Sequence, residues 1–102
     1  MKIVAVDIGG TSIKSGIWDG EKITEWKEQP SYAKKGGDAL IQRVQTIIKS
    51  YGTFDALGIS TAGQVDVENG SIYYANENIP NYTGMKVKKI LADTFRTPVF
   101  VE

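Results

Sequence analysis

The chain has 102 residues, the length of one domain, and its 12 basic and 12 acidic side chains give a formal net charge of zero. This balance predicts no nucleic-acid partner and no membrane surface. Cysteine and histidine are both absent, which excludes disulfides and cysteine-bound zinc within these residues. Acid–base chemistry must therefore use carboxylates or come from groups outside these residues. Because no leader or segment of transmembrane length is visible, we expect a cytoplasmic protein.

The first predicted element is an apolar strand over residues 3–8 that ends in Gly9-Gly10-Thr11. The run does not alternate, which predicts a buried strand. The two glycines are expected to take positive φ and to point their N–H groups at phosphate oxygens, with the Thr11 hydroxyl added. Since Asp7 repels a bare phosphate, its presence suggests a magnesium ion between the two charges. An ordinary strand exit into a tight turn is the alternative.

Two further strands are predicted next, over residues 13–18 and about 22–28. Asp19-Gly20 between them is a strong hairpin signal. Lys14, on the second strand, is either a phosphate contact or a solvated lysine. Trp18 and Trp26 are expected to pack in the core or at an edge, away from the predicted crevice. Residues 29–37 then read as a loop.

The clearest helix follows, with Asp38 as its N-cap and Gly52 as its C-terminal glycine. Its apolar side chains recur at helical spacing. They are Leu40, Ile41, Val44, Ile47, Ile48 and Tyr51.

A buried strand over residues 56–60 leads into a second turn of small residues, 61–63. Short strands at 65–67 and 71–75 flank the hairpin signal Asn69-Gly70. A second helix is predicted from about 84 to 95, with Thr83 as its cap, and a last strand at 99–101. The order predicts a mixed α/β sheet whose first three strands are linked by hairpins, with helices on its faces. Both small-residue turns are expected to face one crevice at the strand ends.

Four segments carry a resemblance to a known family. They are residues 7–14 (Asp-Ile-Gly-Gly-Thr-Ser-Ile-Lys), 58–66 (Gly-Ile-Ser-Thr-Ala-Gly-Gln-Val-Asp), 78–82 (Asn-Ile-Pro-Asn-Tyr) and 97–102 (Thr-Pro-Val-Phe-Val-Glu). In this order and spacing the chain resembles the N-terminal lobe of the ROK family. That family comprises bacterial sugar kinases and sugar-responsive repressors on the actin-like, ribonuclease-H-like ATPase fold. The resemblance implies that residues 1–102 are one such lobe.

The resemblance also implies roles for the first motif. Its loop would hold the phosphates of ATP together with Mg²⁺, with Asp7 as the metal ligand. The loop comprises Asp7, Gly9, Gly10, Thr11 and Ser12. Many family members have lysine where Ser12 stands.

The later motifs resemble the sugar side of the family's site. Gly63, with Gln64 beside it, matches the turn that approaches the sugar, and Asn78 matches an asparagine that hydrogen-bonds sugar hydroxyls. Asn81 and Tyr82 stand where the family commonly has Gly-Trp.

Glu102 matches the glutamate that precedes the family's Asn-Asp pair, and the resemblance implies that it binds the sugar together with Gly63, Gln64 and Asn78. The aspartate of that pair is the family's catalytic base. The pair, the second nucleotide-binding lobe and the histidine–cysteine zinc site are not among these residues. We therefore expect the C-terminal lobe to be a partner and the 102 residues alone to be inactive. The implied activity is ATP-dependent phosphorylation of a hexose, amino-hexose or glucoside, and the family's kinases are often homodimers.

Three alternatives stay open. A sugar-sensing regulator of the same family would carry a DNA-binding helix-turn-helix ahead of the residue matching Met1. Another actin-like ATPase is disfavoured by the combination of Gly63 with Asn78-Ile79-Pro80. A catalytic carboxylate within the chain would be Asp66, for which a structural role in the turn beside Asn69-Gly70 is preferred.

Overall fold

The computed structural model describes all residues from 1 to 102 as seven strands, two α-helices and one 3-10 turn. In chain order these are β1 (Ile3–Ile8), β2 (Ser12–Trp18), β3 (Ile23–Pro30), η1 (Ala33–Lys35), α1 (Gly37–Lys49), β4 (Ala56–Thr61), β5 (Gln64–Asp66), β6 (Ser71–Tyr74), α2 (Val87–Phe95) and β7 (Val99–Val101). Neither helix has the length and apolarity needed to cross a membrane.

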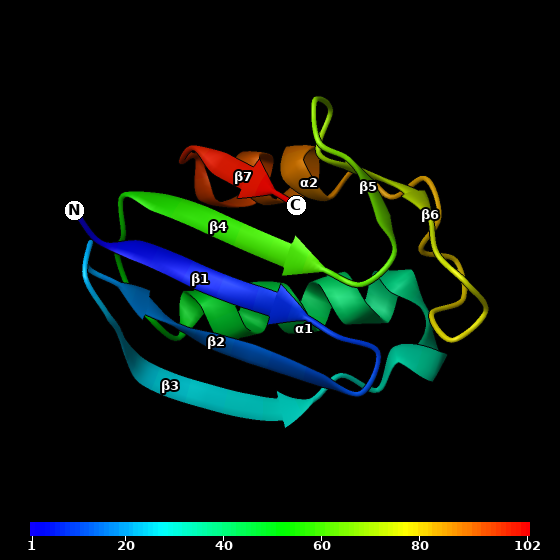
Figure 1. Ribbon diagram of the computed structural model, residues 1–102, viewed down its shortest axis with the longest axis horizontal. Helices are drawn as coiled ribbons and strands as arrows, with labels where there is room; N and C mark the ends of the chain where they lie inside the picture. Colours follow the sequence, from blue (N-terminus) through cyan, green and yellow to red (C-terminus); the bar gives the residue numbers. More distant parts are fainter.

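Five strands form one mixed sheet in the order β3-β2-β1-β4-β7 (Figure 1). The pairs β1–β2 and β2–β3 are antiparallel, whereas β1–β4 and β4–β7 are parallel. The remaining strands, β5 and β6, form a separate two-stranded hairpin. The carboxyl ends of β1, β4 and β7 therefore lie side by side at one edge of the large sheet. The two small-residue turns predicted from the sequence, after β1 and after β4, leave the sheet at this edge.

Both helices lie behind the same face of the large sheet in Figure 1. The apolar stripe of α1 is buried against it, and Leu40, Val44 and Ile48 are at most 1% exposed. These side chains belong to one cluster of 21 buried residues, which also includes Leu91 of α2. Removing this apolar surface from water is the main force that holds the helices on the sheet.

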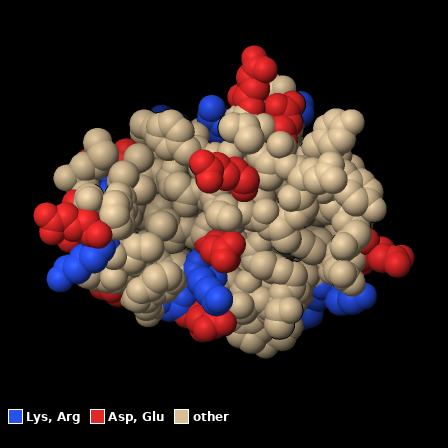
Figure 2. All heavy atoms as spheres, viewed as in Figure 1, with Lys and Arg blue, Asp and Glu red and all other residues tan.

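The opposite face of the sheet is open. Figure 2 shows it as a largely uncharged surface with a short row of acidic and basic side chains across its middle. Trp26 and Phe100, which line the cavity on this face, are 63% and 65% exposed. This face can therefore receive further protein or a ligand without any rearrangement of the core.

The start of α1 differs from the sequence prediction. The helix begins at Gly37 with Gly36 as its N-cap, and no side chain caps it, so Asp38 is not the cap. The reason is a distant backbone contact, since the Gly37 N–H donates to the Pro80 carbonyl at 2.7 Å. Gly36 allows this approach because its φ is 99°.

The start of α2 also differs, because the helix begins at Val87 rather than near residue 84. Thr83 does not cap it. Its hydroxyl instead accepts a hydrogen bond from the Ala75 N–H at 2.9 Å and donates one to the Ala75 carbonyl at 3.1 Å. These hydrogen bonds hold Thr83 beside Ala75, directly after β6. For this reason the first helical turn of α2 begins only at Val87.

The contact at Gly37 gives a stability prediction. A Cβ at this position would lie 2.5 Å from the Asn81 carbonyl oxygen, whereas a Cβ on Gly58 would meet nothing within 4 Å. We expect Gly37→Ala to lower the free energy of unfolding by about 1–3 kcal/mol in urea unfolding. The control Gly58→Ala should leave it unchanged or raise it by about 0.5 kcal/mol. Equal stabilities for the two variants would contradict this packing.

Candidate functional site

The turn between β1 and β2 uses its two glycines for different purposes. The Gly9 N–H donates to the Ser12 carbonyl at 2.9 Å, and a Cβ on Gly9 would lie 2.8 Å from that oxygen. Neither Gly9 nor Gly10 is among the positive-φ residues, so that part of the sequence prediction is wrong. Gly9 is needed for tight closure, and its N–H is engaged within the chain rather than free for a phosphate.

Gly10 and Thr11 form the exposed tip of this turn. Neither backbone N–H donates to an acceptor within the protein, and a Cβ on Gly10 would meet nothing within 4 Å. The fold itself therefore gives no reason for glycine at position 10. Two adjacent free N–H groups at an exposed turn suit an anion, and a bare glycine lets it approach the backbone closely.

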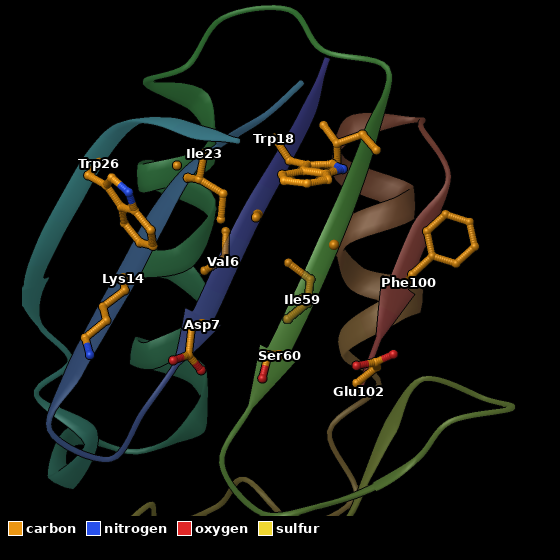
Figure 3. A pocket seen from close by; sticks show the side chains of 14 residues that line it. Val6, Asp7, Lys14, Trp18, Ile23, Trp26, Ile59, Ser60, Phe100 and Glu102 are labelled. Carbon is orange, nitrogen blue, oxygen red and sulfur yellow. The ribbon is translucent and has the colours of Figure 1, made fainter. Parts of the chain in front are cut away.

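A row of polar side chains crosses the open face at the carboxyl edge of the sheet (Figure 3). Asp7 of β1 is paired with Lys14 of β2 on one side and with Ser60 of β4 on the other. Glu102 follows Val101, the last residue of β7, whose partner is Ile59. All four side chains line one cavity of about 610 Å³.

The oxygen atoms of this row are of the kind that a hard cation binds. Asp7 and Glu102 supply carboxylates, Ser60 supplies a hydroxyl, and Asp7 and Glu102 are exposed. No group of three or more carboxylate, histidine or cysteine side chains is close enough to hold a metal unaided. Mg²⁺ commonly binds through one or two carboxylates and takes its other ligands from water and phosphate, so this donor set suits Mg²⁺ with a bound nucleotide.

Trp18 and Trp26 line this cavity together with Asp7 (Figure 3). Neither lines the pocket that the two small-residue turns share, so they lie away from the predicted crevice as expected. Their rings project from β2 and β3 on the open face of the sheet. The alternation of side chains along a strand sends Trp18 to the same side as Lys14, which the sequence interpretation overlooked.

A second, smaller pocket of about 270 Å³ brings the predicted sugar residues together. Gly63, Gln64 and Asn78 line it, and Gly10 lines it as well. The expectation that the two small-residue turns face one crevice is thereby confirmed. Gly63 has φ of 96°, and a Cβ there would lie 2.9 Å from the Tyr74 carbonyl, so glycine is required. Asp7 lines the larger cavity and not this one.

A third cavity, of about 620 Å³, connects the glycine turn with η1. Gly10, Thr11 and Asn78 line it together with Lys34 and Lys35. The two lysines place positive charge beside the free N–H groups of the turn, which favours an anion there. The sequence interpretation passed over them as part of a loop, although a lysine pair shortly after a strand was the available signal.

Tyr82 is another residue whose role the sequence did not reveal. It is 0% exposed, and its hydroxyl lies 2.7 Å from Oγ1 of Thr61. Burial raises the pKa of Tyr82, although the hydrogen bond to Thr61 acts in the opposite direction. This pair joins the segment that carries Asn78 to the end of β4.

Asp66 has the structural role that the sequence interpretation preferred. Its carboxylate accepts hydrogen bonds from Nδ2 of Asn69 at 2.8 Å and from the Asn69 N–H at 3.3 Å. These bonds, the side-chain one first, hold the pKa of Asp66 below its usual range. A carboxylate that closes its own turn in this way is not available as a general base.

The fold is the actin-like fold of the ROK sugar kinases whose structures are solved. The model of the ROK family matches residues 3–102. The chain belongs to the ROK family.

Individual relatives agree with this assignment. An uncharacterized protein of Clostridium perfringens is 44% identical over 101 residues, which cover 95% of this chain and 34% of that protein. An N-acetyl-D-glucosamine kinase of Citrobacter koseri is 27% identical over 90 residues, covering 84% of this chain and 29% of that enzyme. The ROK hexokinase of Thermus thermophilus matches with a TM-score of 0.81 and 29% identity, covering 100% of this chain and 35% of that chain. The chain therefore spans about a third of the length of the curated relatives it matches.

The raised pKa of Tyr82 gives a pH prediction. Relative to its ordinary value of 10.0, the folded chain holds this proton more tightly, so the unfolded chain releases it first as the pH rises. The stability from the buried hydroxyl is present below about pH 10 and is lost as the pH rises through the folded pKa. We expect the free energy of unfolding to fall more steeply above about pH 10 in the wild type than in Tyr82→Phe. Parallel curves would contradict the assignment.

Proposed function

We propose that residues 1–102 form the N-terminal lobe of an ATP-dependent sugar kinase. The observation that carries this proposal is the position of Gly10. It stands at the tip of a turn with two free N–H groups and also lines the pocket that holds Gly63, Gln64 and Asn78. An anionic donor on one side of this residue and a polyhydroxylated acceptor on the other would meet at the turn, as phosphoryl transfer requires.

The phosphate side of the proposed site consists of the turn and the polar row. The N–H groups of Gly10 and Thr11 would bind phosphate oxygens of ATP, with Ser12 at the end of the turn and Lys14 at its flank. Asp7 would hold Mg²⁺, the cofactor that neutralises charge on the phosphates when it is bound. Gly9 would contribute by closing the turn, because its own N–H is already used.

The sugar side is the pocket beside the second turn. Gly63 lets the acceptor approach the backbone, while the amide side chains of Gln64 and Asn78 can each donate to and accept from hydroxyls. The similarity to a hexokinase and to an N-acetyl-D-glucosamine kinase supports a hexose or an N-acetylated amino-hexose as the acceptor.

The group that accepts the proton of the sugar hydroxyl is proposed to lie outside residues 1–102. Asp66 is engaged in its turn, and we propose that the base follows Glu102, as in the family that the sequence resembles. The C-terminal lobe of the same protein is then the partner that completes the site, and the open face of the sheet is free to contact it. The 102 residues alone would bind ligands weakly and turn nothing over.

An assay of ADP release tests the proposal. The whole protein that carries this lobe should release ADP when Mg²⁺, ATP and one member of a panel of hexoses and N-acetylhexosamines are present. The 102-residue chain alone should give no sugar-dependent release. Sugar binding by calorimetry without ADP release would favour the sugar-sensing regulator, and sugar-independent ATP hydrolysis would favour another actin-like ATPase.

Substitutions at the two glycines separate ligand binding from folding. Gly10→Ala places a methyl group in open space, so we expect unchanged thermal stability but at least about a tenfold rise in the KM for ATP, since hydrogen bonds to charged phosphate are obstructed. Gly9→Ala collides with the Ser12 carbonyl and should lower the thermal midpoint. An unchanged KM for ATP in Gly10→Ala would refute the role of the turn.

A further inference from the structure

The segment that carries Asn78 packs into the core through Ile79 and Tyr82, and it is hydrogen-bonded to the large sheet through one side chain. Tyr82, four residues further on, is completely buried, and its hydroxyl meets Oγ1 of Thr61 at 2.7 Å. The other hydrogen bonds of residues 78–82 are made within the segment, to neighbouring residues or to Gly37 of α1. The Tyr82–Thr61 pair is therefore the hydrogen bond by which this segment reaches the five-stranded sheet.

Thr61 lies where three parts of the site converge. Its N–H donates to the carbonyl of Glu102 at 3.1 Å, and the N–H of the next residue, Ala62, donates to the carbonyl of Ile8 at 2.7 Å. Ile8 is the last residue of β1, directly before the glycine turn. The position of Thr61 is thus fixed relative to both the proposed phosphate site and the end of β7.

Asn78 and Gly10 lie on the same pocket but belong to segments that are distant in the sequence. The hydrogen bonds through Tyr82, Thr61, Ala62 and Ile8 form a connected path between these segments. The packing of the buried Tyr82 ring holds the segment in the core, whereas the hydroxyl pair sets its direction and spacing relative to β4. Hydrogen bonds give such geometric definition, which apolar packing alone does not.

We infer that the Tyr82–Thr61 hydroxyl pair is a positioning device, which holds Asn78 at the right place across the pocket from Gly10 for an acceptor sugar to be recognised. This inference rests on the proposed function. Tyr82 touches no ligand, since none of its surface is exposed; it acts through Asn78. Loss of the hydroxyl should weaken recognition of the sugar and leave recognition of the nucleotide intact.

The test uses the whole protein, with kcat and the KM values for its sugar and for ATP measured alongside the thermal midpoint. Tyr82→Phe keeps the ring and removes only the hydroxyl. We expect the KM for the sugar to rise about three- to tenfold, the range for loss of one buried hydrogen bond, while the KM for ATP stays within about twofold. Tyr73→Phe is the matched control, because Tyr73 is 73% exposed and lines neither pocket.

Variants at Thr61 test the same hydrogen bond by changing the partner of Tyr82. Thr61→Ser keeps a hydroxyl and should behave like the wild type, whereas Thr61→Val should raise the KM for the sugar. Thr61→Val also removes the hydrogen bond from Oγ1 of Thr61 to the Ala62 carbonyl at 3.1 Å. The double variant Tyr82→Phe with Thr61→Val should therefore be no worse than Thr61→Val alone, because the bond between Tyr82 and Thr61 is already lost in that single variant. If Tyr82→Phe does not yield folded protein, the comparison of Thr61→Ser with Thr61→Val decides the matter.

Three outcomes overturn the inference. A wild-type KM for the sugar in both Tyr82→Phe and Thr61→Val would do so while the proposed kinase activity stands. A lowered thermal midpoint with unchanged KM values would show that the pair serves stability alone. If the wild-type protein phosphorylates no sugar, the proposed function fails and the inference fails with it.

Discussion

Parallel pairing of β1 with β4 decides where every proposed ligand contact lies. The register places Asp7 beside Ser60 and Ile8 beside Thr61, and the Ala62 N–H continues the ladder by donating to the Ile8 carbonyl at 2.7 Å. Two turns that are far apart in the sequence therefore leave the sheet at the same edge. A shift of one residue would send Asp7 to the helix-covered face, so the apolar core, by fixing the register, also fixes the site.

The sequence predicted the elements wherever burial alone decides them. The apolar run of β1, the stripe of α1 and the short strand β7 were all found because each buries apolar side chains in the core. The non-alternating run of β1 wrongly predicted burial on both faces, because only alternate residues of β1 and β7 are buried and the other face of the sheet is open. The starts of both helices were wrong for a shared reason. The Gly37 N–H is bound to Pro80 and the Thr83 hydroxyl to Ala75, and contacts between distant residues leave no local signal.

The site was predicted in part. The shared crevice of the two turns followed from the topology, and Gly63, Gln64 and Asn78 were chosen through the resemblance to the ROK family; the structure brings all three to one pocket. The properties of Gly9 and Gly10 were not separable from sequence, because only the backbone path shows which N–H is already engaged. The bond between Tyr82 and Thr61 could not be predicted from the sequence, because the two residues are 21 positions apart and only the folded backbone brings their hydroxyl groups together.

The central claim is that the turn after β1 binds the nucleotide while the pocket beside it binds the sugar. Hydrogen–deuterium exchange of the whole protein tests both halves at once. With Mg²⁺ and a non-hydrolysable ATP analogue, exchange should slow in the peptide that covers residues 9–12; with sugar, it should slow in the peptide that covers residues 76–83. Exchange in α1 should not change with either ligand. Unaltered exchange over residues 9–12 in the nucleotide-saturated protein would contradict the account.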